Sequence, residues 1–181
     1  GLQRQRAQSF AQGEWLLWVD ADEIVTQELA FSIQQAISEA AEQDVFQVKR
    51  LSYFFGRFIR HSGWYPDTVV RLYRRDKYQY DDALVHEKVL CPGANIKTLE
   101  GDLLHYTATD FRDYMTKSIR YADDWAEERL RRGKRATLSK AIIHSAAAFL
   151  RKYLIQKGFL DGRHGFLLAV TTSFYVFNKY T

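Results

Sequence analysis

The sequence predicts an α/β fold in which a mixed sheet with flanking helices is followed by a basic helical extension. Over residues 1–108, short apolar runs bounded by turn residues alternate with segments of helical periodicity. Residues 109–181 show helical periodicity alone. Charge divides the chain similarly, because residues 1–128 contain 15 Lys and Arg against 21 Asp and Glu, whereas residues 129–181 contain 11 against 1. We therefore expect two parts, residues 1–108 and residues 109–181.

The first part is predicted to begin with a helix that leads into a short apolar strand. Thr26 is a favourable N-cap for the next helix, in which Leu29, Ile33 and Ile37 recur at four-residue spacing. The segment 54–66 contains Gly and Pro among many aromatic residues, and we expect it to be a loop. In chain order, the expected elements are a helix at 2–11, a strand at 15–19, a helix at 27–43, and extended segments at 45–53, 67–74, 84–90, 95–99 and 102–106.

The second part is predicted to consist of three helices. Asp110 can cap the first, which runs to about residue 132 and is ended by Gly133. The other two are expected at 138–156 and 163–178. Nine basic residues and no acidic residue lie between residues 129 and 160, interleaved with large apolar residues. This composition suits an anionic lipid surface, although a solvated helical face would show the same pattern.

Composition indicates a folded protein without an intrachain disulfide bond. The chain has 181 residues, of which 46% are hydrophobic and 15% aromatic. Its single cysteine, Cys91, excludes an intrachain disulfide and is typical of a reducing compartment. No cysteine–histidine spacing suggests a zinc site. No apolar run reaches the roughly 18 residues that span a bilayer.

An apolar strand that ends in two aspartates is the most informative motif. The run from Trp15 to Val19 leads directly into Asp20, Ala21 and Asp22. Because strand residues alternate between faces, the two carboxylates are expected to share one face. Paired carboxylates at the carboxyl end of a strand suit Mg²⁺ or Mn²⁺ together with substrate phosphates. Solvated loop acids are the alternative, and an EF-hand loop fits poorly because no glycine or third oxygen ligand follows.

Several motifs, in this order, resemble family 2 glycosyltransferases of the GT-A fold. The segment from Gly1 to Glu23 reads Gly-x-x-Arg-x-Arg-Ala, followed by Trp-Leu-Leu-Trp-Val-Asp-Ala-Asp-Glu. The later motifs are Arg71-Leu-Tyr-Arg-Arg, Val85-His86-Glu87 and Leu104-His105-Tyr106. Two longer segments, 53–67 and 158–165, resemble the lipopolysaccharide core β-glucosyltransferases of Gram-negative bacteria.

The resemblance implies an inverting, metal-dependent transferase that moves a hexose to the lipopolysaccharide inner core. It favours UDP-glucose as donor and a heptose acceptor, with a location on the cytoplasmic face of the bacterial inner membrane. Compared with this family the chain begins late, so we expect a partial GT-A domain at 1–108 without its nucleotide-binding half. A helical, membrane-associating extension is then expected at 109–181.

The metal site is predicted to comprise Asp20, Asp22 and His105. By resemblance Asp22 is the direct ligand, while Asp20 contacts the donor ribose or holds the metal through water. A late histidine completes the metal site in similar enzymes, and neutral imidazole is an acceptable ligand. A structural, hydrogen-bonded histidine is the alternative reading of His105.

The catalytic base is predicted to be Glu87, because a carboxylate within an otherwise apolar strand requires a reason to be there. Burial would raise its pKa toward a useful value. His86 points to the opposite face and is assigned to substrate binding. Arg71 lies in mid-strand, where its planar guanidinium could bind phosphate or acceptor, and an ordinary surface strand residue is the alternative. An outward-facing Glu87 paired with Lys88 is the alternative.

Two further residues are assigned to substrate binding. Arg6 precedes the key strand on a helix, as does Arg4, and both could contact the donor phosphates, with a solvated helical face as the alternative. Trp64 could stack on an acceptor sugar ring, and simple loop packing explains it equally well.

Two other functions stay open at this stage. One is a GT-A transferase with another acceptor, such as a capsule or protein glycan. The other is a noncatalytic module that binds an anionic membrane or polyanion. Nucleic acid is not expected as a partner, because the sequence contains no RNA- or DNA-binding motif.

Overall fold

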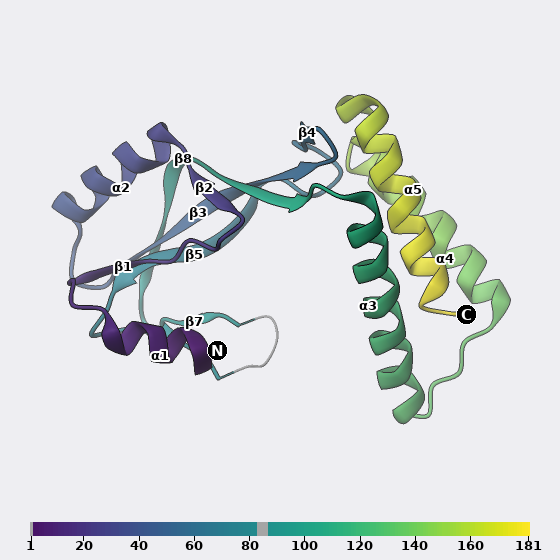
Figure 1. Ribbon diagram of the computed structural model, residues 1–181, viewed down its shortest axis with the longest axis horizontal. Helices are drawn as coiled ribbons and strands as arrows, with labels where there is room; N and C mark the ends of the chain where they lie inside the picture. The colour runs from purple at the N-terminus through teal and green to yellow at the C-terminus, as the bar shows by residue number, and fades with distance from the viewer. Residues whose placement is uncertain (1, 83–86) are drawn as a thin grey trace. The chain divides into compact units, whose positions relative to one another are not determined.

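The computed structural model describes residues 2–82 and 87–181, which form two compact units (Figure 1). The first unit consists of Gly1–Arg50 and Asp67–His105, and the second of Leu51–Pro66 and Tyr106–Thr181. The sequence predicted one boundary, after residue 108, between two continuous parts of the chain. In the structure, the predicted loop around residues 54–66 belongs instead with the helices of the second unit.

A mixed sheet forms the framework of the first unit. Its strand order is β1-β5-β3-β8-β2, with β4 paired to β3. Contacts between β3 and β8 join residues of constant separation, Gln47 to Thr98 and Lys49 to Glu100, so these two strands run in the same direction. The other pairings are antiparallel. The strands are β1 (Trp15–Leu17), β2 (Glu23–Val25), β3 (Asp44–Phe54), β4 (Arg57–Phe58), β5 (Asp67–Arg74) and β8 (Asn95–Ala108).

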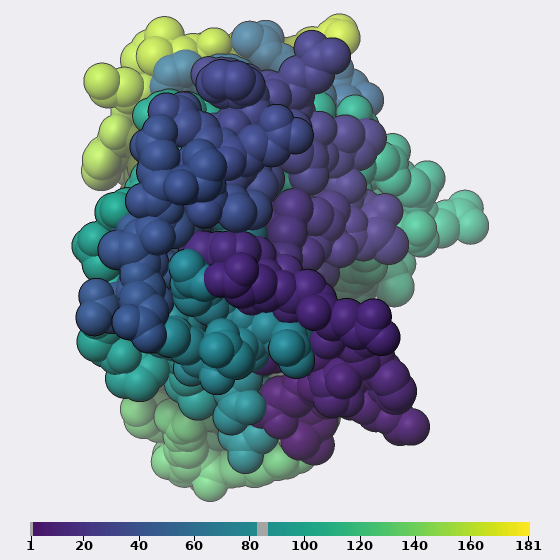
Figure 2. Space-filling model, turned by 90° about the vertical axis from the view of Figure 1, so that its left-hand side faces the viewer, coloured from purple at the N-terminus to yellow at the C-terminus, as the bar shows by residue number. Residues whose placement is uncertain are grey.

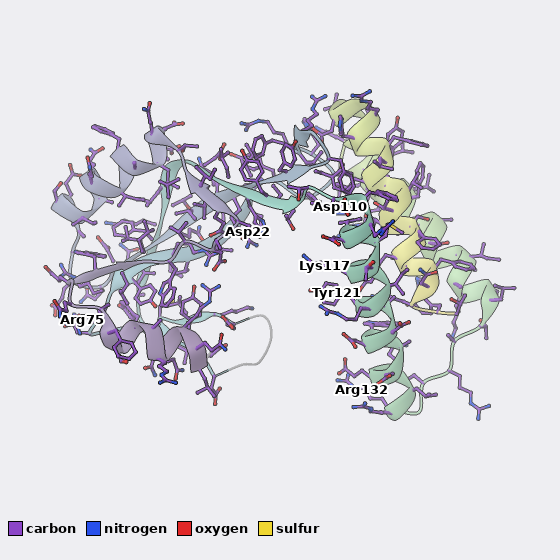
Figure 3. The ribbon with its side chains drawn as sticks, in the orientation of Figure 1. Asp22, Arg75, Asp110, Lys117, Tyr121 and Arg132 are labelled. Carbon is purple, nitrogen blue, oxygen red and sulfur yellow. The ribbon has the colours of Figure 1, made fainter. Side chains whose placement is uncertain are left out.

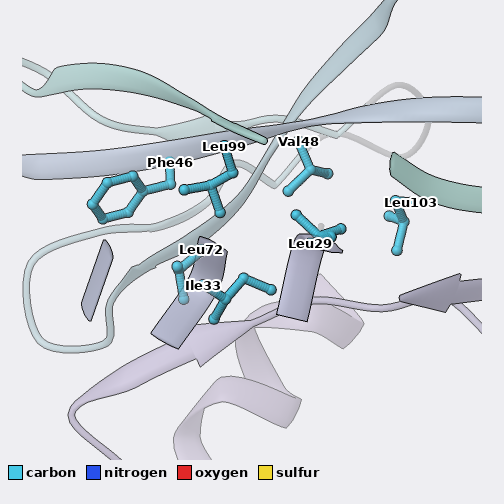
Figure 4. Close-up of a cluster of buried hydrophobic side chains, with 7 residues drawn as sticks. All are labelled: Leu29, Ile33, Phe46, Val48, Leu72, Leu99 and Leu103. Carbon is cyan, nitrogen blue, oxygen red and sulfur yellow. The ribbon is translucent and has the colours of Figure 1, made fainter. Parts of the chain in front are cut away.

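One face of this sheet is covered by helix α2 (Gln27–Glu39), as Figure 4 shows. Thr26 caps the helix by accepting a hydrogen bond from the Leu29 N–H over 3.3 Å. Gly101 has φ +84° and lies against α2, where an added Cβ would meet the Leu29 nitrogen at 2.3 Å. The buried side chains of this cluster are Leu29, Ile33, Phe46, Val48, Leu72, Leu99 and Leu103.

The opposite face of the sheet carries an aromatic cluster, and helix α1 (Leu2–Phe10) lies beside it. Val45 on β3 and Tyr73 on β5 are each next in sequence to a residue of the first cluster, so their side chains point to this opposite face. Both are buried and pack with Tyr80. Two short strands, β6 (Gln79–Tyr80) and β7 (Val89–Leu90), pair with each other, and α1 contacts β6. Figure 2 shows the purple N-terminal residues packed against teal residues of this unit. The amide of Gln8 donates to two carbonyls just before β6, which fixes α1 against this segment.

Three helices make up most of the second unit. They are α3 (Phe111–Arg131), α4 (Leu138–Leu150) and α5 (Gly162–Asn178), with a π-helical turn at Arg151–Ile155 and a 3-10 turn at Gly158–Asp161. Helix α5 packs against both α3 and α4. Asp110 and Thr137 cap α3 and α4 through their side-chain oxygens. Among the described residues, no helix has the length and apolarity that crossing a membrane requires.

The motif at residues 158–165 packs against the loop before Pro66 and is hydrogen-bonded to it. The buried carboxylate of Asp161 accepts the His61 N–H over 2.9 Å and lies 3.1 Å from His61 Nδ1. Gly165 lets helix α5 approach the backbone of the 3-10 turn closely, because an added Cβ would lie 1.8 Å from the Gly158 carbonyl oxygen. The two sequence segments that resemble core glucosyltransferases therefore pack on each other.

Most expected elements are confirmed, with several differences. The helix expected at 27–43 ends at Glu39, and the short strands β4 and β6 were not expected. The extended segments at 95–99 and 102–106 are one continuous strand, β8, because Gly101 bends the chain without ending it. The helix expected at 138–156 changes to a π-turn after Leu150. The strand at 23–25 was not expected. The strand at 84–90 lies partly outside the described residues.

Candidate active site

The acidic motif is a tight turn between β1 and β2 (Figure 3 labels Asp22). The Glu23 N–H donates to the Asp20 carbonyl over 2.9 Å, and the Asp20 N–H donates to Glu23 Oε2 over 2.9 Å. Strand alternation therefore does not govern Asp20 and Asp22, and the expectation that they share a strand face was wrong. Their carboxylates contact different partners.

Glu23 provides the buried carboxylate at the centre of this site. Its side chain is fully buried, and that of Arg71 is 5% exposed. Arg71 Nη2 donates to Glu23 Oε1 over 2.7 Å, and Arg50 Nη1 lies 3.9 Å from the same oxygen. The Trp18 N–H donates to the Arg71 carbonyl, which holds β5 beside the turn. A carboxylate removed from water requires such pairing to remain charged.

Asp20 joins two arginines from different elements. Its Oδ2 accepts from Arg71 over 2.7 Å, and its Oδ1 accepts from Arg4 of α1 over 2.7 Å. Partial burial opposes ionisation of Asp20, but the hydrogen bonds and charges of Arg71 and Arg4 outweigh it and hold its pKa below the ordinary value. For Arg71, burial favours the neutral form, and the neighbouring Glu23 and Asp20 more than compensate, so its pKa is raised. Asp20 and Arg71 are therefore both ionised near neutral pH.

Arg4 extends the network to Glu87. Its Nε lies 2.8 Å from Glu87 Oε2, and its guanidinium lies 4.9 Å from the Tyr80 ring centroid and 5.4 Å from that of Trp18. Aromatic faces attract cations, so the two rings help to orient Arg4. Helix α1 thus contributes a positioned arginine to the site.

Asp22 and His105 are brought together by the pairing of β2 with β8. The register places Glu23 opposite His105, and His105 Nε2 lies 3.3 Å from Asp22 Oδ2. The Asp22 side chain is half exposed, whereas that of His105 is 18% exposed. Two of the three predicted metal ligands are therefore adjacent.

The side chains fit a divalent cation with two protein ligands rather than three. In the part of the chain that the structure describes, no group of three His, Cys, Asp or Glu residues is arranged to hold a metal. The two oxygens of Asp20 each accept a hydrogen bond from an arginine. Asp22 and His105 offer an oxygen and a nitrogen donor. Mg²⁺ typically takes one or two carboxylates and completes its shell with water and phosphate oxygens.

A cavity of about 720 Å³ opens beside this network. Its wall includes both ends of the network, Arg4 and Arg50, and a strip of β5 that ends at Arg71. The volume is within the range of small-molecule sites. The charged side chains that line it are Arg4, Arg50, Arg71, Lys88, Asp20 and Glu87.

Glu87 differs from the buried base that the sequence predicted. It precedes β7, and its side chain is 27% exposed and paired with Arg4. An ion pair with an arginine favours the charged carboxylate, which is the opposite of the raised pKa expected from burial. Its place on the cavity wall agrees with a role in the site, and that role stays a prediction.

Two of the other predicted substrate-binding residues, Arg6 and Trp64, are not part of this network. Arg6 is exposed on α1, and the inward-facing arginine of this helix is Arg4. Trp64 belongs to the second unit, where its ring packs edge-on against Phe54 with centroids 5.4 Å apart. His86 lies outside the described residues.

Two charged residues of the network were not predicted from the sequence. Glu23 follows the motif directly, and an acid that begins an apolar strand was a signal for burial. Arg50 pairs with Asp67 across β3 and β5, with Nε and Oδ2 2.8 Å apart. The β-strand register places these two residues directly opposite each other, which no local sequence pattern reveals.

Comparison with known proteins places the chain close to glycosyltransferases. No protein-family model matches it. It is 28% identical to a protein named lipopolysaccharide core biosynthesis glycosyltransferase LpsC from Rhizobium meliloti (strain 1021), over 97% of this chain and 65% of the relative. It is 25% identical to uncharacterized glycosyltransferases from Rickettsia prowazekii (strain Madrid E) and Rickettsia typhi (strain ATCC VR-144 / Wilmington), over 95% of this chain and 62% of each relative.

These similarities confirm the predicted resemblance to glycosyltransferases and, among them, to one of lipopolysaccharide core biosynthesis. The chain spans slightly less than two thirds of the length of these relatives. The alignments cover nearly the whole chain, so both units fall within them.

Proposed function

We propose that the chain carries part of the catalytic domain of a family 2, GT-A-fold glycosyltransferase of lipopolysaccharide core assembly. The donor is UDP-glucose, the acceptor is an inner-core heptose, and transfer inverts the anomeric carbon. The observation that carries the proposal is the Asp20–Glu23 turn beside a cavity with positioned arginines. The similarity to a lipopolysaccharide core transferase supports the acceptor class.

In this proposal, Asp22 and His105 would hold a divalent cation, Mg²⁺ or Mn²⁺. The bound cation supplies positive charge for the departing diphosphate. Asp20 acts differently, because it holds Arg71 and Arg4 at the cavity wall. Those guanidinium groups suit phosphate oxygens, which they can bind in a bidentate manner.

Glu87 is the proposed base. Its carboxylate takes the proton of the acceptor hydroxyl while that oxygen forms a bond to the anomeric carbon, and the bond from this carbon to the diphosphate breaks. The diphosphate leaves with the electron pair. Arg4 contacts both Glu87 and Asp20, so a donor phosphate that engages Arg4 would weaken the contact between Arg4 and the Glu87 carboxylate.

The second unit is proposed to hold the enzyme at the cytoplasmic face of the inner membrane. Its acid-free basic run and the exposed apolar side chains along α4 suit an anionic lipid surface. The acceptor is itself a lipid-linked glycan, so the same surface brings enzyme and acceptor together.

The test follows transfer of labelled glucose from UDP-glucose to membranes whose lipopolysaccharide ends at the inner-core heptose, using the whole protein. Asp22→Ala should lower transfer about a hundredfold or more, because charge stabilisation by a metal is worth several kcal/mol. A chelator should abolish transfer, and added Mg²⁺ or Mn²⁺ should restore it. The matched control is Asp76→Ala, an exposed acid of the same unit. Transfer that persists with Asp22→Ala and with chelator would contradict the proposed metal site. No transfer by the wild-type protein would contradict the assignment of UDP-glucose as the donor.

A further inference from the structure

A second cavity, of about 730 Å³, lies within the helical unit. It is formed by the C-terminal half of α3, the α3–α4 connection, the start of α4 and the end of α5. This is the end of α3 that Figure 3 marks with Arg132, opposite Asp110. The cations that line the cavity are Arg129, Lys134, Arg135, Lys140 and Lys179.

Two acids, Asp123 and Glu127, also line the cavity, and Glu127 pairs with Arg131. Among the described residues, Lys134, Arg135 and Lys140 make no side-chain hydrogen bond or ion pair. By contrast, Arg131 and Arg132 on the adjoining turn each pair with a glutamate four residues earlier. The five cations of the lining therefore exceed its two acids, which leaves the cavity with an excess of positive charge.

Two further cations of the cavity rest on an aromatic ring. Lys179 Nζ lies 4.3 Å from the Trp125 centroid, and the Arg129 guanidinium lies 4.7 Å from it. Partial burial and the neighbouring Arg129 lower the pKa of Lys179, which shows that the two charges oppose each other. Tyr180 packs on Trp125 with centroids 5.1 Å apart. An anion bound here would relieve the repulsion between the two cations.

Apolar side chains flank the cavity and stand in solvent. Leu130 lines it and is 69% exposed, and Leu138 at the start of α4 is 63% exposed. Ile142 and Ile143 continue the exposed apolar surface along α4. A ligand that fits both the cationic cavity and the exposed apolar side chains beside it would carry a phosphate group and a hydrocarbon chain.

We propose that this cavity binds the phosphate group of an anionic lipid, with the acyl chains along the exposed apolar residues of α3 and α4. The inference rests on the membrane-surface part of the proposed function and not on the transfer chemistry. It differs from general attraction to a negative surface, because it assigns the phosphate to particular residues.

The test measures binding of the purified whole protein to phosphatidylcholine vesicles with and without phosphatidylglycerol. The cavity variant is Lys134→Gln/Arg135→Gln, both exposed and therefore of little consequence for folding, which circular dichroism would verify. The charge-matched control is Arg151→Gln/Lys157→Gln, which removes two cations from the same acid-free run outside the cavity. We expect the cavity variant to bind anionic vesicles about tenfold more weakly than the control variant.

A competition arm separates lipid from free phosphate. At constant ionic strength, glycerol 3-phosphate should displace wild type from anionic vesicles and leave the residual binding of the cavity variant unchanged. Equal losses in the two variants would overturn the proposal in favour of unspecific attraction. Binding of glycerol 3-phosphate without vesicle binding would overturn the lipid assignment, and so would no binding of either probe. None of these outcomes alters the labelled-glucose assay, so failure of the transferase proposal is detected separately.

Discussion

Glu23→Ala would remove the buried carboxylate on which the network converges. The Glu23 side chain has no exposed surface and accepts hydrogen bonds from Arg71 over 2.7 Å and from the Asp20 N–H over 2.9 Å. Arg71 would remain buried with Asp20 as its nearest carboxylate. The turn would also lose the side-chain acceptor that closes it.

The expected cost follows from these contacts. Breaking a buried ion pair by removing one partner costs about 3–5 kcal/mol, and the surviving Asp20 contact favours the lower end of that range. We therefore expect a loss of about 3 kcal/mol in the free energy of unfolding. Glu23→Gln keeps an acceptor and loses the charge, so its loss should be about 1–2 kcal/mol. Asp67→Ala is the control, because its ion pair with Arg50 is 42% exposed on the Asp67 side and should be worth less than about 1 kcal/mol.

Urea unfolding followed by circular dichroism measures these differences. With a slope of about 2 kcal/mol/M, Glu23→Ala should lower the midpoint by about 1.5 M. A Glu23→Ala midpoint no lower than that of Asp67→Ala would refute the reasoning, because the buried carboxylate would then contribute no more than an exposed one.

Two further predictions concern acid stability and close packing. The pKa of Asp20 is held below 3.8 by its arginine partners, so its contribution to stability is complete above that pH and lost as pH falls through the lowered pKa. Asp20→Asn should therefore flatten the fall in the free energy of unfolding below about pH 4, measured by urea unfolding at a series of pH values, and a fall as steep as that of wild type would contradict this. Gly165→Ala should lower the melting temperature of the helical unit, because its Cβ would lie 1.8 Å from the Gly158 oxygen and overpacking costs about 1–3 kcal/mol. Gly13→Ala, with its nearest contact at 3.4 Å, is the control.

Local patterns predicted the regular elements of this chain well. The helix after Thr26 and the strand at residues 67–74 follow from capping, spacing and turn residues, and the structure confirms both. Such signals are contained in a few adjacent residues. The sequence could not reveal that the segment around residues 54–66 belongs with the helices, because the buried Asp161 that fixes it lies about one hundred residues away.

The candidate site shows the same limit at the level of side chains. The sequence predicted Asp20, Asp22, His105 and Arg71 by residue type, and the structure places them around one turn. Which of them contact each other depends on strand register. The pairing of β2 with β8 places His105 beside Asp22. The hydrogen bond from the Trp18 N–H to the Arg71 carbonyl places Arg71 beside Asp20.

The different partners of Asp20 and Asp22 indicate different roles for these two residues of one acidic motif. Asp20 has both oxygens engaged by arginines, so it holds cations in place for an anionic ligand. Asp22 is half exposed and has His105 as its neighbour, so its oxygens are accessible to a cation. Substitution of Asp20 should therefore disturb donor binding through its arginines, whereas substitution of Asp22 should disturb the response to metal. Measuring the dependence of transfer on Mg²⁺ or Mn²⁺ in Asp20→Asn and in Asp22→Asn would distinguish the two roles, and an equal shift in metal dependence in both variants would contradict the division.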